Sequence, residues 1–226
     1  MASSDRLISK ADKLIQSGKY KDAKFKLQDY LLKNPKDEKV LWKLVNVYMM
    51  NNDAVNSVKT LRKILNYNSG SKYSIIDFIR HKLVKKFPKS SEVIQFQFEL
   101  ELQNKDYKSL YYTLKKLNED KLTEIRDKYK NKLKMLKKIN DVDFILNNNI
   151  DLFYKLFFTN FVLEKYNKAF DYIEEILNRN IEPEMNLILE FLKIFQNIEN
   201  DNPFLNYYIG RILVKNEKYN NAIKEF

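Results

Sequence analysis

Glycine and proline are scarce in this chain, with three and four copies among 226 residues. All-β folds need many tight turns, and glycine supplies the positive φ angles of those turns at the least cost. The three glycines are also far apart, which excludes a glycine-rich phosphate-binding loop. The composition therefore indicates an all-α protein.

Apolar residues recur at intervals of three and four along the chain, which is the spacing of an amphipathic helix. The first segment shows the pattern at Leu7, Ala11 and Leu14, and the breakers Gly18 and Pro35 end the first two segments. Short loops between amphipathic helices favour antiparallel packing, so consecutive helices should form hairpins. We expect helices at 5–17, 20–33, 37–50, 54–67, 72–87, 90–103, 106–117, 120–139, 150–163, 166–179, 184–199, 203–215 and 218–226.

Several of these segments begin with residues that cap helices. Asp37, Asp53, Ser90 and either Asp201 or Asn202 can accept a hydrogen bond from a backbone N–H group of the first helical turn. Pro203 fits the first position of a helix, where its missing donor costs little.

One short motif returns along the chain. Residues 18–23 read GKYKDA, and 164–169 and 217–222 read EKYNKA and EKYNNA. Residues 105–110 (KDYKSL) and the pair at 53–54 are weaker copies. With the apolar residues, asparagine and proline that follow its first copy, the motif resembles a tetratricopeptide repeat, a helix–turn–helix unit of about 34 residues.

The resemblance implies an irregular right-handed α-solenoid that forms one domain over 1–226. Two clear repeats are expected in 5–67, degenerate basic repeats in 68–149, and C-terminal repeats in 150–226 with the last one incomplete. The later copies of the motif are 53 to 59 residues apart, which is room for about three helices. Because solenoids need polar caps, we expect the chain to be the N-terminal part of a longer protein.

Reactive side chains are few. The chain has no cysteine and one histidine, so we expect no catalytic residue, no metal site and no cofactor. His81 should be exposed and paired with Asp77 one helical turn away. The carboxylate clusters at 174–175 and 182–184 are interpreted as solvated helix surfaces, because acid–base work needs one desolvated partner.

Charge is distributed unevenly. Residues 1–140 hold 32 Lys and Arg against 16 Asp and Glu, whereas 141–226 hold 9 against 14. The basic half would attract an acidic protein, a nucleic acid or an anionic membrane surface. Alternatively, the lysines only keep an exposed helix face hydrated. The densest run contains Lys128, Lys130, Lys132, Lys134, Lys137 and Lys138.

In tetratricopeptide repeat proteins the first helix of each unit lines a concave groove. The resemblance therefore suggests eight groove residues: Trp42, Asn46, Met49, Tyr154, Phe158, Phe161, Tyr207 and Arg211. Two alternatives stay open. Trp42 either packs between repeats or anchors a partner, and the 150–163 helix, apolar on all sides, is either sandwiched in the stack or lines an aromatic groove. Chaperone-binding members clamp a peptide carboxylate with Lys and Asn, whereas this chain has Ile8 and Asp12 at the corresponding places.

These features favour a protein–protein interaction scaffold whose partners are acidic segments bound in a helical groove. Its charged N-terminal segment favours a soluble cytoplasmic protein. Composition suggests an AT-rich bacterial source and an envelope or motility assembly. Self-association through the C-terminal end is a second expected interaction. The alternative function is RNA binding through the basic N-terminal half, for which Tyr111, Tyr112 and Tyr129 would be the stacking residues.

Overall fold

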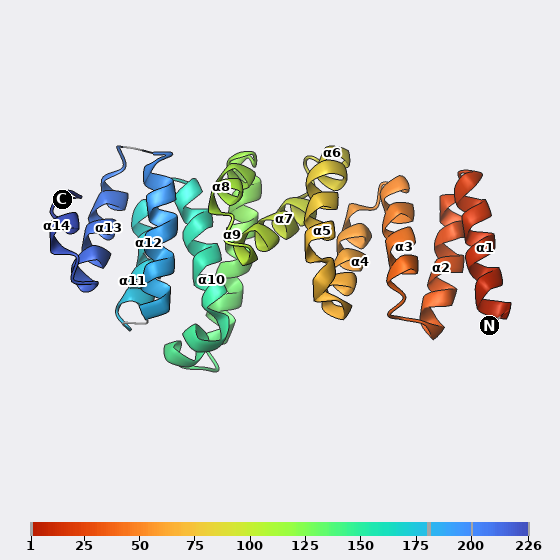
Figure 1. Cartoon of the computed structure of the whole chain (residues 1–226), viewed down its shortest axis with the longest axis horizontal. Coiled ribbons are helices and arrows are strands. Elements are labelled where there is room, and N and C mark those ends of the chain that lie inside the picture. The colour runs from red at the N-terminus through yellow and green to blue at the C-terminus, as the bar shows by residue number, and fades with distance from the viewer. Residues whose placement is uncertain (1, 180–181, 200, 226) are drawn as a thin grey trace. The chain divides into compact units, whose positions relative to one another are not determined.

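The computed structural model describes residues 2–179, 182–199 and 201–225 (Figure 1). These residues form helices and turns, with no strand among them. A 3₁₀ turn (Ser69–Ser71) precedes α5, and a π-helical turn (Ile79–Leu83) joins α5 to α6. The helices are α1 (Ala2–Gln16), α2 (Tyr20–Lys33), α3 (Glu38–Met50), α4 (Ala54–Tyr67), α5 (Lys72–Phe78), α6 (Val84–Lys86), α7 (Ser91–Gln103), α8 (Tyr107–Lys115), α9 (Glu119–Leu136), α10 (Val142–Val162), α11 (Tyr166–Leu177), α12 (Glu182–Gln196), α13 (Pro203–Lys215) and α14 (Tyr219–Ala222).

The chain divides into two compact units, Met1–Leu100 and Glu101–Phe226. In the first unit α1 packs against α2, α2 against α3, and α3 against α4, as neighbouring antiparallel helices (Figure 1). In the second unit α10 packs against α9 and α11, and α12 packs against α13. The prediction of an all-α protein built from helix hairpins is confirmed, and the single domain over 1–226 stays a prediction.

The cores of the two units differ in chemistry. Unit 1 is mainly aliphatic, and Leu41, Leu61 and Ile75 are examples of its fully buried side chains. Unit 2 is mainly aromatic. Its buried rings come from α8, α10, α11 and α12, and they include Tyr107, Tyr111, Tyr154, Phe157, Phe158, Phe161, Phe170, Phe191 and Phe195. Each unit thus covers the apolar stripes of its own helices.

Five helix pairs share one turn geometry. The turn residue has a left-handed backbone, with φ of 72° at Gly18 and 58° at Asn52, Lys105, Glu164 and Glu217. In each turn, the amide of that residue donates to a carbonyl three residues back, and the next amide donates to a carbonyl five residues back, at N···O distances of 2.8–3.2 Å. This pair of bonds is the Schellman arrangement that satisfies the last carbonyls of a helix.

The same turn also starts the following helix. The residue after the left-handed one accepts the first helical hydrogen bond, as when the Ala23 amide donates to the Lys19 carbonyl at 3.0 Å. Four of the turns have a small, buried residue five positions past the left-handed one. These residues, each at most 2% exposed, are Ala23, Ser57, Ala169 and Ala222. A small side chain here lets the two helices approach closely.

The predicted caps at Asp37, Asp53 and Ser90 are also found, and of the two candidates before α13 the cap is Asn202. Asp37 and Asp53 accept from the Val40 and Asn56 amides at 3.1 and 3.0 Å. The Ser90 and Asn202 side chains accept from Val93 and Phe204 at 3.4 and 3.1 Å. Asp106 and Asn118 cap α8 and α9 in the same way, although the sequence analysis did not single them out.

The largest departure from the expected helix boundaries is at α10. The asparagine run at 147–149 was expected to separate two segments, and the helix is kinked there, because Asn149 has non-helical backbone angles, with φ of −142° and ψ of 31°. The helical stretch that begins at Val142, before this kink, was not expected. Ile145 and Leu146 are fully buried, so tertiary contact holds this turn despite its poor helix formers. The segment expected at 218–226 is helical only over Tyr219–Ala222.

The left-handed turns generate a stability prediction. Replacing exposed Lys105 with glycine removes the cost of a side chain at positive φ, so Lys105→Gly should raise the free energy of unfolding of unit 2 by about 0.5–1 kcal/mol. Lys108→Gly, in the helix three residues later, should lower it by about 1 kcal/mol. Urea unfolding followed by circular dichroism measures both. A lower midpoint for Lys105→Gly would contradict this account.

Candidate functional site

Three predicted groove residues lie inside the protein. Tyr154 is 5% exposed, and Phe158 and Phe161 are fully buried. The Phe158 ring contacts those of Phe191 and Phe195 on α12, at centroid distances of 5.2 and 5.6 Å. The assignment of these residues to an open groove is therefore wrong. Of the two alternatives for this helix, the structure shows the sandwiched one, because α8, α9 and α11 also pack against α10.

The predicted groove residues on α3 are divided between core and surface. Trp42 meets the ring of Phe78 edge-on at a centroid distance of 5.3 Å, and its indole N–H donates to Glu38 at 3.3 Å. Met49 packs against the same hydrophobic core, and Asn46 is exposed. Trp42 thus has the packing role among its two predicted alternatives.

The last two predicted residues lie on α13. Tyr207 is 49% exposed, and the Arg211 guanidinium lies 5.6 Å from the centre of its ring. Arg211 also forms an ion pair with Glu174 on α11. The ion pair holds Arg211 against α11, and the Tyr207 ring beside it stays half-exposed.

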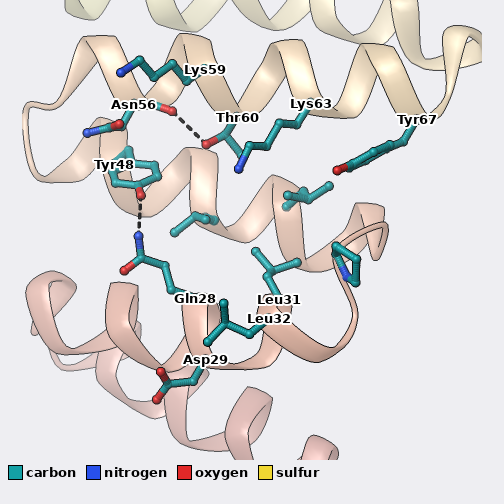
Figure 2. A pocket seen from close by; sticks show the side chains of 13 residues that line it. Gln28, Asp29, Leu31, Leu32, Tyr48, Asn56, Lys59, Thr60, Lys63 and Tyr67 are labelled. Carbon is teal, nitrogen blue, oxygen red and sulfur yellow. Dashed lines mark hydrogen bonds between the residues drawn. The ribbon is translucent and has the colours of Figure 1, made fainter.

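An open groove lies elsewhere, between α2 and α4 in unit 1, with α3 as its floor (Figure 2). Its volume is about 540 Å³. Helices α2, α3 and α4 all contribute side chains to its lining. From α2 come Gln28, Asp29, Leu31 and Leu32, and from the loop after it comes Pro35. From α3 come Leu41, Leu44 and Tyr48, and from α4 come Asn56, Lys59, Thr60, Lys63 and Tyr67. The floor is apolar, since Leu41 and Leu44 face into it.

Polar groups inside the groove bind one another. The Gln28 amide donates to the Tyr48 hydroxyl at 2.9 Å, and the Thr60 hydroxyl donates to the Asn56 carbonyl at 2.8 Å (Figure 2). Burial raises the pKa of Tyr48, which keeps its hydroxyl neutral. The interior therefore offers mainly apolar contact.

The rims of the groove carry the charge. Lys59 and Lys63, one turn apart on α4, are exposed, and neither forms an ion pair within the part of the chain that the structure describes. Asp29 and Leu32, the latter 83% exposed, are on the α2 rim. At one end the Lys36 amine lies 5.9 Å from the centre of the Tyr67 ring.

The α2–α4 groove lies on a different face of α3 from the residues that the sequence analysis selected. On a helical projection, Trp42, Asn46 and Met49 share one side, and Leu41, Leu44 and Tyr48 lie on another. The available signal was the spacing of Asn56, Lys59, Lys63 and Tyr67 along one side of α4. The family resemblance directed attention to the first helix of each repeat instead.

The predicted basic patch is exposed on α9 and just after it. Lys128, Lys130, Lys132, Lys134, Lys137 and Lys138 are all exposed, on both flanks of the buried stripe formed by Leu122, Ile125, Tyr129 and Leu133. Lys137 pairs with Glu175 at 3.2 Å. Of the three tyrosines expected to stack on bases, Tyr111 and Tyr129 are 5% exposed, and Tyr112 is 47% exposed. Two of the three are thus too buried to stack on a nucleic acid.

Glu199 in unit 2 accepts hydrogen bonds from tyrosines. Glu199, after α12, accepts hydrogen bonds from the hydroxyls of Tyr111 and Tyr166, the second at 3.4 Å. Burial, together with the Glu199 charge, raises the pKa of Tyr166 to about 12, and the same causes raise that of Tyr111. No three His, Asp or Glu side chains among the described residues come together as a metal site would need.

Two smaller expectations concern single ion pairs. His81 and Asp77 are both exposed and lie 3.4 Å apart, as predicted. Asp12, which replaces a clamp residue of the chaperone-binding proteins, pairs with Lys43 on α3 at 2.5 Å. That lysine is thus engaged by a carboxylate of the chain itself.

Of the helices that the structure describes, none has the length and apolar character to cross a bilayer.

Solved structures with similar folds were found by comparison. This chain is similar to tetratricopeptide repeat proteins. One of them, from Parabacteroides merdae, is 13% identical, with a TM-score of 0.31, and the match covers 100% of this chain and 91% of that one.

Another is pilF of Pseudomonas aeruginosa, which is 14% identical with a TM-score of 0.29, and the match covers 99% of this chain and 73% of that one. A third is MamA of Desulfovibrio magneticus RS-1, which is 12% identical with a TM-score of 0.25, and the match covers 99% of this chain and 90% of that one. No protein-family model and no curated protein matches the chain. Because identities and TM-scores are low, the function is argued below from the groove alone.

The buried rings predict how alanine substitutions behave. Phe158→Ala should destabilise unit 2 by about 3–5 kcal/mol, because it leaves a cavity among packed aromatic rings. Tyr207→Ala, at a half-exposed ring on the same unit, should change stability by less than about 1 kcal/mol. Thermal unfolding measures both, and equal effects would show that Phe158 does not have this buried position.

The tyrosines around Glu199 predict an alkaline transition. A neutral tyrosine is favoured in the fold, so its contribution to stability is present below its ordinary pKa of about 10 and is lost as the pH rises through about 12. Glu199→Gln should lower the pKa of Tyr166, and Glu217→Gln is the control on an exposed turn. Tyrosinate absorbance and circular dichroism against pH test this, and identical titrations for all three proteins would contradict it.

Proposed function

We propose that this protein is an interaction scaffold that binds a segment of a partner protein in the α2–α4 groove. The observation that carries the proposal is an open groove with an apolar floor and, on its rim, two lysines that have no ion-pair partner among the residues that the structure describes. Helix-repeat proteins bury their core between neighbouring helices and leave long surfaces for partners. Apolar surface rimmed by polar groups is typical of interaction sites.

A binding role fits this groove better than a catalytic one. Its titratable groups are two exposed lysines, one exposed aspartate, and a buried tyrosine whose hydroxyl accepts a hydrogen bond from Gln28. General acid–base work requires a group that is both desolvated and able to change its protonation near neutral pH. The apolar floor and the rim lysines instead supply contact area and electrostatic steering.

Protein is favoured over RNA as the partner. Base stacking needs exposed aromatic faces beside the cationic groups. Tyr111 and Tyr129, near the basic patch, are buried. In the α2–α4 groove the exposed apolar groups are aliphatic as well as aromatic, with Leu32 next to the opening. That mixture suits an amphipathic polypeptide.

Site-specific photo-crosslinking tests the proposal. A photoreactive amino acid is placed in the full chain at Leu32 or Lys63, which line the groove, or at the control Tyr73, which is 79% exposed on α5. In the source cells, both groove positions should crosslink to the same polypeptide in a nuclease-resistant product, and Tyr73 should not. Crosslinks that are equal at all three positions, or that disappear on nuclease treatment, would overturn the proposal.

A further inference from the structure

The α2–α4 groove also defines the chemistry of what it binds. We propose that its occupant is an amphipathic helix of a partner protein that carries two carboxylates one turn apart along one edge. This inference rests on the proposed scaffold function and goes further, because it names the conformation, length and charge pattern of the bound segment.

The conformation follows from the walls of the groove. They are helices, whose backbone amides and carbonyls bond within each helix, so the groove offers side chains rather than free backbone groups. An extended peptide would bring unpaired N–H and C=O groups against Leu31, Leu41 and Leu44, which is costly. A helix satisfies its own backbone and presents only side chains, so it is the favoured occupant.

The length follows from α4. Groove residues run from Asn56 to Tyr67, which corresponds to about 17 Å at the helical rise. A bound helix that follows this rim would need about eleven residues, or three turns. Leucine-sized side chains on one face would contact the floor and the exposed Leu32 on the α2 rim.

The charge pattern follows from the rims. Lys59 and Lys63 are neighbours on one side of α4, about 6 Å apart at their Cβ atoms, and carboxylates four residues apart on a bound helix have the same separation. Both amines are exposed and, among the described residues, without an acidic partner. Asp29 on the opposite rim would repel a third carboxylate. The acidic edge of the occupant therefore faces α4.

Binding of designed peptides by the full chain tests this inference, with fluorescence anisotropy as the readout. Three helix-forming peptides of about 14 residues share a leucine face and differ at two edge positions four residues apart, which are Glu, Gln or Lys. The Glu peptide should bind about 5- to 10-fold more tightly than the Gln peptide at low salt, and added salt should reduce that ratio. The Lys peptide should bind most weakly.

Protein variants assign the effect to the two lysines. Lys59→Gln/Lys63→Gln should abolish the preference for the Glu peptide. Lys85→Gln/Lys86→Gln removes the same charge from exposed positions of α6 and should preserve it. Lys59→Glu/Lys63→Glu should reverse the preference in favour of the Lys peptide. A preference that survives the first double substitution would overturn the inference.

Leu32→Ala separates this inference from the proposed function. If Leu32→Ala weakens all three peptides about tenfold while Glu and Gln peptides bind equally, the groove binds helices and the charge pattern is wrong. If Leu32→Ala changes the affinity of no peptide and the photo-crosslinks at Leu32 and Lys63 are not formed, the groove is not a binding site and the proposed function is wrong. Displacement of the Glu peptide by an RNA oligonucleotide, with a steep salt slope, would identify a nucleic-acid site instead.

Discussion

The close crossing of paired helices at a left-handed turn is the constraint on which the rest of this structure depends. The turn closes the carbonyl end of one helix, and the residue after the left-handed one supplies the first acceptor of the next helix. At four of the five turns, a small, buried residue five positions past the left-handed one allows the two helices to approach. Four of the five left-handed positions hold residues other than glycine, so tertiary packing stabilises a conformation that the local sequence does not favour.

The two units fill the space between their helices in different ways. In unit 1, branched aliphatic side chains pack between helices that follow one another closely, and the surface keeps a groove over α3. In unit 2, the rings of α8, α10 and α12 interdigitate, with Phe157 in contact with Phe191 at 5.3 Å and with Phe170 at 5.4 Å. Such rings bury large areas, and the apolar side chains of residues 152–162 of α10 are all buried. The same repeat pattern thus gives an open surface in one unit and a closed aromatic core in the other.

Local signals in the sequence predicted most of the helices, because caps and turns depend on a few neighbouring residues. Asp37 and Asp53 start helices and Gly18 ends one, as their chemistry requires. The candidate site was not predictable in this way. Burial of Phe158 is decided by α12, more than thirty residues away, and helical periodicity alone does not distinguish a sandwiched aromatic face from an exposed one. Predicting the groove would have required the tertiary arrangement in which α2 and α4 lie on either side of α3.

The distribution of charge suggests why the two groove lysines matter more than the others. Residues 1–100 hold 20 Lys and Arg against 10 Asp and Glu, whereas 101–226 hold 21 against 20, so nearly all of the net positive charge belongs to unit 1. Most of those lysines are exposed to solvent, where salt screens their charges over about 8–10 Å, so they raise the rate of encounter with an acidic partner without selecting its register. Lys59 and Lys63 lie beside an apolar floor that excludes water when it is covered. There each ion pair is less screened, and the fixed spacing of two amines on a helix selects one alignment of the bound segment over the alternatives.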